Sequence, residues 1–438
     1  MTAAMMLFTR DLRLSDNPAL TAAVTSAPQV VPAFVLDDDI LTRCADHASR
    51  LAFLLASLAD LDAGLREAGG ALVIRQGQWP AAVLGLAREA GVSVIHVADD
   101  VSGYARARLA ALERGAAAER IGVVRHPGVL VIPPGAVQPA AGGPFQVFTP
   151  HYRRWLEAPR RTPAPRPGAI TLPSGLRHGR LPALARVTTA RPAPGLAPGG
   201  ESPGLARLRA FAGADLAAYA TARDDLAADR VSRISAYLHL GCLSPADVAA
   251  TLAGQPGGEP FVRQLAWRDF FHQVLAARPD AAHRDYRARG DRWHDDPGAL
   301  AAWQQGQTGF PVVDAGMRQL AAEGFLHNRA RMVVASFLTK DLYLDWRLGA
   351  AHFMRLLADG DVACNQLNWQ WVAGTGTDTS AHRVFSPLRQ GQRFDPSGDY
   401  VRRYVPELAD LAAEAIHDPD PATRRRCGYP APLVDHRA

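Results

Sequence analysis

The pattern of apolar residues changes type part-way along this chain of 438 residues. Over residues 1–131, short apolar runs typical of buried strands alternate with helical patterns, whereas from residue 203 onward only helical patterns remain. Alternating strands and helices form a parallel sheet that helices cover on both faces. We therefore expect an α/β protein with a doubly wound, Rossmann-like N-terminal domain and an all-α C-terminal domain.

The N-terminal domain is predicted to end near residue 131. Its predicted strands are 5–8, 30–35, 71–74, 92–97 and 121–124, and its predicted helices are 49–68, 81–90 and 104–114. Ligands of such sheets bind beyond the carboxyl ends of the strands, so we expect a pocket near residues 34–38 and 96–103. The first strand is not followed by GxGxxG, which argues against a nicotinamide dinucleotide site.

A connector rich in Pro, Gly and Arg follows at residues 132–202, interrupted by one predicted helix at 145–155. Residues 203–438 form the predicted all-α domain. Its predicted helices are 206–219, 245–252, 260–276, 311–322, 326–342 and 350–358, several with Pro in the first turn.

Charge and cysteine usage narrow the class of protein. The net charge of +5 is compatible with a nucleic-acid partner, although Lys340 is the only lysine among 48 basic residues, so a bias towards Arg explains much of the count. The four cysteines have no metal-ligand spacing, so we expect free thiols and no metal site. Without a signal-peptide pattern or a membrane-spanning apolar stretch, a soluble cytoplasmic protein is expected.

The stretch 324–378 has the composition of a ligand site. It begins as a helix whose neighbouring turns carry Asn328, Arg331 and Met332 beside an apolar stripe. Three Trp, an Asp-Gly-Asp turn and an Asn-rich run follow. A folded interior accepts so many polar groups only when they have hydrogen-bond partners. We therefore expect a large bound ligand there.

Several motifs of this chain resemble those of the DNA photolyase and cryptochrome family, most closely the class I photolyases that repair cyclobutane pyrimidine dimers. The similar segments are FTRDLRLSDNPAL at 8–20, HNRARM at 327–332, DWR at 345–347, ADGD at 358–361 and NWQWVAGTGTD at 368–378. The resemblance can be followed over nearly the whole chain. It implies that the all-α domain binds FAD.

The loop before residue 236 is the predicted diphosphate site. Ser232, Arg233 and Ser235 offer hydroxyl, guanidinium and backbone donors at the start of a helix, although Ser at such a position is commonly only a cap. The resemblance implies that FAD contacts Tyr219, Val231, Ser232, Arg233, Ile234, Ser235, Arg331, Asp359, Gly360, Asp361 and Asn365. In particular, Arg331 pairs with Asp359, and Asn365 faces flavin N5 and stabilises reduced flavin. The alternative for the two aspartates is a helix-ending turn whose carboxylates face water.

Two further sets of residues take their roles from the resemblance. The family's electron-transfer chain is matched by Trp293, Trp346 and Trp369. The alternative role for these tryptophans is packing in the core. Contact with a flipped-out dimer is implied for Gln264, Trp267, Arg268, Asn328, Arg329, Met332 and Trp371. Gln264 replaces a customary Glu, and Val231, Cys364 and Ser386 are further departures from the family's usual residues.

An antenna chromophore is also implied in the first domain, near Arg50 and Asp100. The segment 100–106 favours 8-hydroxy-deazaflavin over methenyltetrahydrofolate. The alternative is that Asp100 caps the following helix and that Arg50 is a solvated helix residue.

The resemblance as a whole implies a monomeric deoxyribodipyrimidine photo-lyase. Excited, reduced FAD would pass one electron to a cyclobutane pyrimidine dimer in ultraviolet-damaged DNA. A cryptochrome-like blue-light photoreceptor, a six-four photoproduct photolyase, and a flavoprotein that binds DNA without repairing it are the alternatives.

Overall fold

The computed structural model describes residues 3–378, 380 and 382–435. The chain divides into two compact units. Unit 1 comprises Met1–Arg191, Ala197–Ala217 and Ser232–Pro279, and unit 2 comprises Pro192–Leu196, Ala218–Val231 and Asp280–Ala438. Residues 232–279 fall in unit 1 by this criterion, so the compact units are a different division from the domains expected at 1–131, 132–202 and 203–438. Those domain boundaries stay a prediction.

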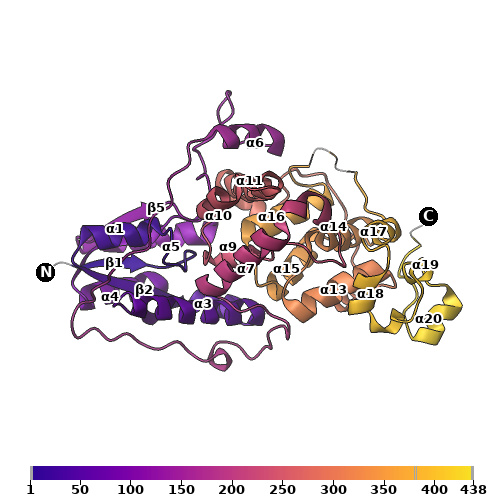
Figure 1. The fold of residues 1–438 in the computed structure, drawn as a ribbon, viewed down its shortest axis with the longest axis horizontal. Coiled ribbons are helices and arrows are strands. Elements are labelled where there is room, and N and C mark those ends of the chain that lie inside the picture. Colours follow the sequence, from indigo (N-terminus) through magenta and orange to yellow (C-terminus); the bar gives the residue numbers. More distant parts are fainter. Residues whose placement is uncertain (1–2, 379, 381, 436–438) are drawn as a thin grey trace. The chain divides into compact units, whose positions relative to one another are not determined.

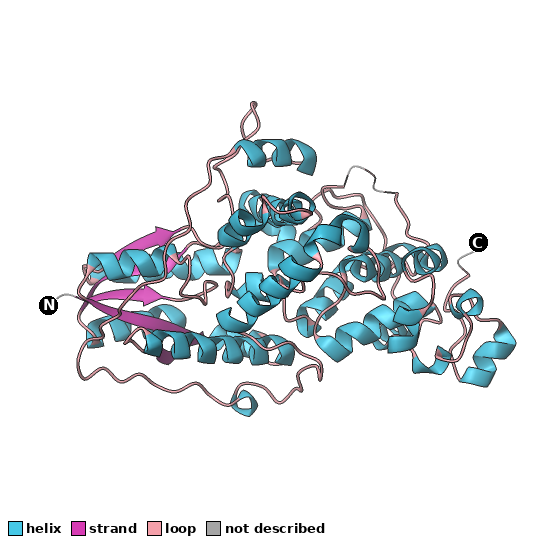
Figure 2. Ribbon diagram, in the orientation of Figure 1, coloured by secondary structure: helices cyan, strands magenta, loops and turns pink. Residues whose placement is uncertain are grey.

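Unit 1 contains the parallel sheet that the alternating pattern predicts. Its strands are β1 (Ala3–Leu7), β2 (Gln29–Asp37), β3 (Val73–Gly77), β4 (Val92–Ala98) and β5 (Gly122–His126). They lie in the order β3-β2-β1-β4-β5, and every paired neighbour is parallel. Figure 1 labels β1, β2 and β5, and Figure 2 shows the strands as magenta arrows. All five residues of the central β1 are buried, as expected for a strand with helices on both faces. The α/β fold class is confirmed.

The helices around the sheet are α1 (Pro18–Ser26), α2 (Asp38–Arg43), α3 (Ala48–Glu67), α4 (Trp79–Glu89) and α5 (Gly103–Ala118). Helix α1 begins because Asn17 Oδ1 accepts a hydrogen bond from Leu20 N at 3.1 Å and proline occupies the first helical position. Leu86 of α4 and Leu112 of α5 pack in one buried cluster with Met5 of β1. These two helices therefore cover the same face of the sheet.

The remaining helices of unit 1 are α6 (Phe148–Glu157), α7 (Glu201–Ala214), α9 (Ser235–Leu240), α10 (Pro245–Leu252) and α11 (Gly258–Ala277). Between α6 and α7, the described chain has no regular structure except the short 3-10 helix η1 (Leu184–Arg186), as the Pro- and Gly-rich composition predicts. The carboxylate of Glu201 accepts hydrogen bonds from Leu14 N at 2.8 Å and Ser15 N at 2.9 Å. This contact fastens α7 to the loop that follows β1.

Unit 2 is helical throughout its described residues apart from loops and one isolated bridge. Its helices are α8 (Tyr219–Ala222), α12 (Pro297–Gln305), α13 (Pro311–Glu323), α14 (Asn328–Ser336), α15 (Trp346–Leu356), α16 (Val362–Ala373), α17 (Pro387–Phe394), α18 (Asp399–Tyr404), α19 (Ala413–Ile416) and α20 (Pro421–Cys427). Its core includes the fully buried side chains of Trp303, Phe337 and Trp346.

Two helix predictions in unit 2 are wrong in their bounds. The helix expected at 326–342 begins at Asn328, where His327 caps it, and becomes a π-helix at Phe337–Asp341. The helix expected at 350–358 begins instead at Trp346, because the Asp345 side chain accepts a hydrogen bond from Arg347 N at 2.9 Å and acts as its N-cap. None of the helices in the described chain combines the length and apolarity needed to cross a bilayer.

Candidate functional site

The predicted site residues are divided between the two units. Unit 1 carries Arg50, Asp100, Ser232, Arg233, Ile234, Ser235, Gln264, Trp267 and Arg268. Unit 2 carries Tyr219, Val231, Trp293, Asn328, Arg329, Arg331, Met332, Trp346, Asp359, Gly360, Asp361, Asn365, Trp369 and Trp371.

The amide of Asn365 on α16 is held in one orientation. It is 9% exposed, and its Nδ2 donates to Ala350 O at 3.0 Å and to Gln366 Oε1 at 3.1 Å. A backbone carbonyl can only accept, so Nδ2 must lie on that side. Within residues 3–378, 380 and 382–435, no donor reaches Asn365 Oδ1. This unfilled acceptor fits the N–H group that flavin N5 carries when it is protonated.

The predicted ion pair between α14 and the ADGD turn is present. Arg331 Nη2 lies 2.8 Å from Asp359 Oδ2, while Arg331 Nε donates to Leu326 O at 2.8 Å. The Asp359 side chain is 5% exposed and Asp361 is 4% exposed, so the alternative of carboxylates facing water is wrong. Asp361 also caps α16, accepting from Cys364 N at 2.9 Å.

The loop that leads into α9 has a backbone suited to anions. Arg233 has a φ of +53°, and Ile234 follows with φ −94° and ψ 4°. Successive residues in left- and right-handed helical conformations turn their N–H groups towards one concavity, a common anion site. Tyr219 of unit 2 is 8% exposed, and burial raises the pKa of its phenol to about 12. Its hydroxyl is therefore a neutral hydrogen-bonding group.

Two of the predicted electron-transfer tryptophans lie on helices that touch. A Cβ placed on Gly349 of α15 would lie 2.2 Å from Trp369 Cη2 of α16, so glycine permits this close approach. Trp346, one turn before Gly349, donates from Nε1 to Asp285 Oδ1 at 2.9 Å, and the Arg347 guanidinium lies 4.8 Å from its ring centroid. The indole of Trp346 is thus anchored at its polar edge.

Trp293 lies beside the segment that precedes Trp346. His294 and Leu344 form an isolated parallel bridge, which places the ring centroids of Trp293 and Tyr343 4.9 Å apart. Sequence analysis missed Tyr343, as it missed Trp303, whose ring centroid lies 6.0 Å from that of Trp369. Both are aromatic residues near the predicted chain, but neither belongs to a motif that marks it.

Trp267 of unit 1, a predicted substrate contact, has one face of its indole covered by another aromatic ring. Phe148 of α6 stacks on Trp267 of α11 with a centroid separation of 3.6 Å and an interplanar angle of 7°. Gln264 lies one turn before Trp267, and its Nε2 donates to Pro260 O at 3.4 Å. Sequence analysis missed Phe148. The aromatic residues Phe148, Tyr152 and Trp155, which recur at helical spacing, were the available signal.

The two arginines assigned to DNA contact have protein partners. Arg268 donates to the carbonyls of Val129 and Leu238. Arg329 Nη2 lies 2.9 Å from Asp224 Oδ1, and its guanidinium lies 4.3 Å from the centroid of Phe394. These contacts give both residues a structural role, and their contact with DNA stays a prediction.

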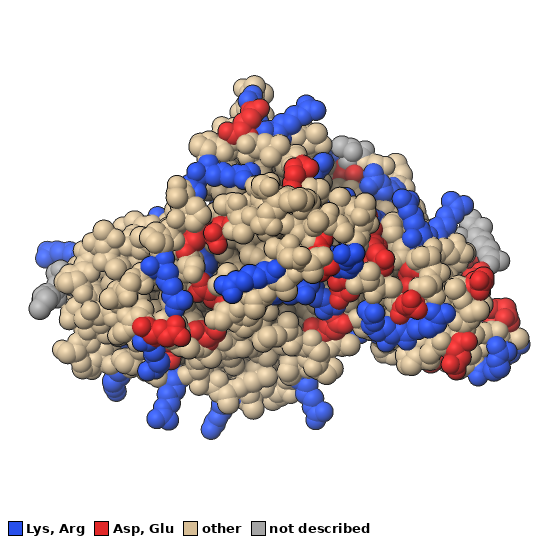
Figure 3. Space-filling model, in the orientation of Figure 1, with Lys and Arg blue, Asp and Glu red and all other residues tan. Residues whose placement is uncertain are grey.

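Asn328 and Met332 lie on one face of α14, because Asn328 Nδ2 lies 4.0 Å from Met332 Sδ. Trp371 of α16 has the Arg383 guanidinium 5.1 Å from its ring centroid. On the face shown in Figure 3, basic and acidic side chains are interspersed rather than gathered in one basic stripe. Surface charge on this face therefore does not by itself mark a DNA site.

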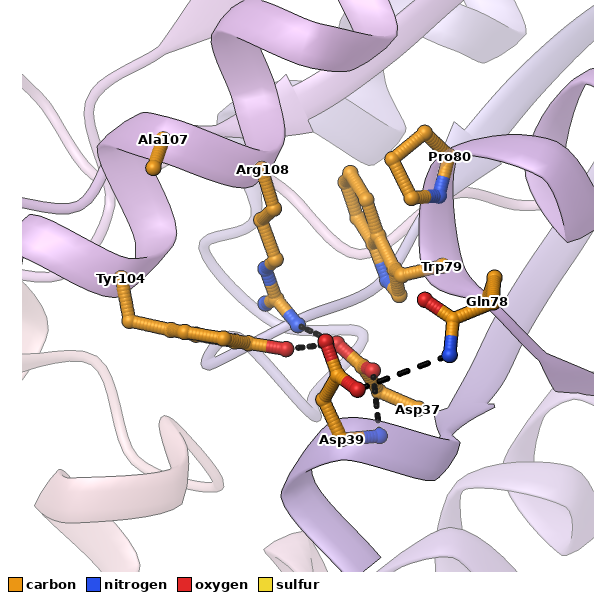
Figure 4. A pocket seen from close by; sticks show the side chains of 8 residues that line it. All are labelled: Asp37, Asp39, Gln78, Trp79, Pro80, Tyr104, Ala107 and Arg108. Carbon is orange, nitrogen blue, oxygen red and sulfur yellow. Dashed lines mark hydrogen bonds and ion pairs between the residues drawn. The ribbon is translucent and has the colours of Figure 1, made fainter.

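A cavity of about 250 Å³ lies at the carboxyl ends of β2 and β3. It includes Asp37 of the predicted range 34–38, but no residue of the predicted range 96–103 lines it. It is lined by Asp37, Asp39, Gln78, Trp79, Pro80, Tyr104, Ala107 and Arg108 (Figure 4). Asp37 Oδ2 accepts from the Tyr104 hydroxyl at 2.7 Å and from Arg108 Nη1 at 3.3 Å. The Arg108 guanidinium lies 4.4 Å from the Trp79 ring centroid, so the cavity combines aromatic surfaces with both signs of charge.

The two predicted antenna residues do not line this cavity. Asp100 is paired with Arg10 Nη1 at 3.0 Å, and its other oxygen accepts from Ser102 N at 2.8 Å. Helix α5 is capped by Ser102, whose hydroxyl accepts from Ala105 N at 3.3 Å. The alternative that Asp100 caps this helix is therefore wrong.

Two family models and several relatives match this chain. Residues 4–168 match the family model described as DNA photolyase, and residues 261–438 match the FAD binding domain of DNA photolyase. The chain is 49% identical to a deoxyribodipyrimidine photo-lyase of Streptomyces griseus over 99% of its length and 97% of the relative. It is 34% identical to the Escherichia coli deoxyribodipyrimidine photo-lyase over 100% of its length and 96% of that relative.

Solved structures show the same fold. A class III photolyase from Agrobacterium tumefaciens has a TM-score of 0.92 and 33% identity, covering 100% of this chain and 95% of that one. A Synechocystis cryptochrome has a TM-score of 0.93 and 27% identity, covering 100% and 97%. An archaeal photolyase from Sulfolobus tokodaii, solved with two FAD molecules, has a TM-score of 0.87 and 29% identity, covering 99% and 96%. The chain therefore belongs to the DNA photolyase family.

Proposed function

We propose that this protein is a deoxyribodipyrimidine photo-lyase that uses light and reduced FAD to split cyclobutane pyrimidine dimers in ultraviolet-damaged DNA. The observation that carries the proposal is the buried Asn365 amide, whose nitrogen is bound to protein acceptors while its oxygen is left to accept. The relatives named as deoxyribodipyrimidine photo-lyases support the same activity. The class I assignment stays a prediction, since one similar structure is of class III.

When bound, reduced FAD supplies the excited electron that the repair reaction needs. The chain's own residues bind and orient it. Asn365 Oδ1 would accept a hydrogen bond from N5–H, and the Arg331–Asp359 pair would hold the ADGD turn beside the cofactor. The other proposed cofactor contacts are Tyr219, Gly360, Asp361 and the loop of Val231, Ser232, Arg233, Ile234 and Ser235. The backbone amides of this loop are proposed to bind the diphosphate.

The proposed substrate contacts start from Trp267. Because Phe148 covers one face of the indole, a flipped base is proposed to stack on the opposite face. Stacking of this kind is worth about 1–3 kcal/mol per base, and a damaged base is the easiest to flip. Gln264 uses its Nε2 on Pro260 O, so its Oε1 is left to accept from a pyrimidine N–H. Asn328, Met332 and Trp371 are the proposed contacts from unit 2.

Trp369, Trp346 and Trp293 are proposed to carry electrons to the flavin during photoreduction. The contact of α15 and α16 at Gly349 supports a short path between Trp346 and Trp369. The contact of Trp293 with Tyr343, three residues before Trp346, supports the continuation. Asp285 holds the Trp346 indole in place through its N–H group.

The cavity at Trp79 and Tyr104 is the proposed antenna site. Its aromatic side chains suit a planar pigment, and 8-hydroxy-deazaflavin remains favoured over methenyltetrahydrofolate. The archaeal relative solved with two FAD molecules makes a second flavin the runner-up. Acid extraction of the purified protein, followed by chromatography and mass spectrometry, would identify the pigment. Cytoplasmic location and a monomeric state also belong to this proposal.

A cryptochrome-like photoreceptor is the second candidate, favoured by the similarity to the Synechocystis cryptochrome. A six-four photolyase is the third, because Gln264 replaces the customary Glu. One experiment separates them: an oligonucleotide with a single cyclobutane thymine dimer is mixed with chemically reduced protein under blue light, beside a dark control. We expect light-dependent recovery of thymines. Flavin binding without repair would reject the photo-lyase proposal and favour the alternatives.

A further inference from the structure

The residue that follows Asn365 adds a second acceptor, beside Ala350 O, that constrains the direction of its amide. Gln366 Nε2 donates to Ala282 O at 3.0 Å, and a backbone carbonyl can only accept. The Gln366 side chain must therefore place Oε1 on its other side, where it accepts from Asn365 Nδ2 at 3.1 Å. The second hydrogen of the same nitrogen goes to Ala350 O at 3.0 Å.

These two contacts use both N–H hydrogens of the Asn365 side chain. An asparagine amide can normally rotate and present either its oxygen or its nitrogen to a ligand. Here, rotation would place Oδ1 against Ala350 O and Gln366 Oε1, two acceptors, with no hydrogen between them. Leaving such buried groups unpaired costs about 1–3 kcal/mol each. The amide is thereby restricted to accepting.

We propose that Gln366 is a positioning residue that makes Asn365 an acceptor-only partner of flavin N5 and so favours the protonated form of N5. This inference rests on the proposed FAD site and adds the residue that sets its hydrogen-bond polarity. The side chain of Gln366 is bonded to Asn365 Nδ2 and Ala282 O, so its proposed effect on the flavin passes through Asn365.

The test compares two replacements of Gln366. Gln366→Met keeps the approximate length but supplies no strong acceptor. Gln366→Glu keeps an acceptor for Asn365 Nδ2 but cannot donate to Ala282 O. A purely structural role through Ala282 predicts that both variants fail, whereas a positioning role predicts that only the Met variant does. Asn368→Ala, which removes an exposed amide bound to Cys364 O on the same helix, is the matched control.

The readout is the protonation state of flavin N5 during stepwise photoreduction, followed by visible absorption as a function of pH. We expect the Met variant to lower the N5 proton affinity at least tenfold, and the Glu and Asn368→Ala variants to keep it. Unchanged N5 protonation in the Met variant, equal loss in the Glu variant, or the same loss in Asn368→Ala would each overturn the inference.

Flavin content and dimer repair of the unaltered protein are measured first. Absence of bound flavin would reject the proposed function itself. Repair by the unaltered protein, together with a Met variant whose N5 behaves normally, would reject only the role of Gln366.

Discussion

Arg331 Nη2 and Asp359 Oδ2 lie 2.8 Å apart, and the carboxylate partner is almost fully buried. The pair joins α14 to the ADGD turn, which precedes the helix that bears Asn365. Removing the charge of Asp359 would leave a guanidinium without its strongest partner. We expect Asp359→Asn to reduce the free energy of unfolding by about 2–3 kcal/mol, in the range for hydrogen bonds to charged groups, and to lower the FAD content of the purified protein.

The matched control is the exposed pair of Arg402 and Asp399, whose nitrogen–oxygen distance is 3.0 Å and whose carboxylate side chain is 59% exposed. Solvent screens exposed ion pairs, so Asp399→Asn should change stability little. Urea unfolding curves and the flavin-to-protein absorbance ratio measure both effects. Equal losses in the two variants would contradict the special role of the buried pair.

Gly349→Ala tests the close contact of α15 with α16. The added methyl would lie 2.2 Å from Trp369 Cη2 and 2.6 Å from Leu338 Cδ2, too close without rearrangement. Overpacking of this kind costs about 1–3 kcal/mol, and the movement of Trp369 should also slow photoreduction. Gly213→Ala in α7 is the control, because no heavy atom lies within 4 Å of the new methyl. Alanine should stabilise that helix by about 0.5–1 kcal/mol.

Trp369→Phe tests the proposed electron path. Phenylalanine keeps most of the apolar contact with Phe353, whose ring centroid lies 5.0 Å from that of Trp369, but it is much harder to oxidise. Photoreduction of the oxidised flavin should fall strongly, while dimer repair by chemically pre-reduced protein should continue. Normal photoreduction in this variant would remove Trp369 from the path.

The fold could be predicted because its signals are local. Buried strands such as Val92–Ala98 are continuous apolar runs, and helices such as Pro245–Leu252 begin with a capping serine and a proline. The start of α15 was misplaced because its N-cap, Asp345, precedes a tryptophan and an arginine, and the apolar pattern becomes regular only later. The π-helix at Phe337–Asp341 has no sequence signal, since it depends on packing.

The candidate site could be predicted only where motifs mark it. Arg331 and Asp359 were paired from the resemblance, and the structure confirms the pair. Gln366 was not found, because its role depends on Ala282 and Ala350, which offer backbone carbonyls and carry no side-chain signal. The functions of Arg268 and Arg329 illustrate the reverse problem. Sequence position favoured DNA contact, whereas their observed contacts are with the protein itself.

The last prediction is that the protein loses stability in acid, in part because of the imidazole of His96 in β4. His96 is 5% exposed, its Nδ1 lies 2.9 Å from His126 Nε2, and its Nε2 lies 3.1 Å from Ser26 Oγ. Burial, with the neighbouring His126 as a smaller cause, lowers the pKa of His96 from 6.5 to about 4. The folded state therefore binds a proton at His96 less well than the unfolded chain does. The contribution of neutral His96 to the free energy of unfolding is complete above pH 6.5 and is lost as the pH falls towards 4.

Between pH 7 and pH 5, this one group should remove about 1–2 kcal/mol from the free energy of unfolding. His96→Gln has no titrating proton and can still hydrogen-bond to Ser26 or His126, so its stability should fall less over the same interval. His151 and His352, whose pKa values burial also lowers to about 4, would still make the variant somewhat acid-sensitive. Urea unfolding at both pH values gives the difference, and identical pH dependence in the two proteins would show that folding does not lower the pKa of His96.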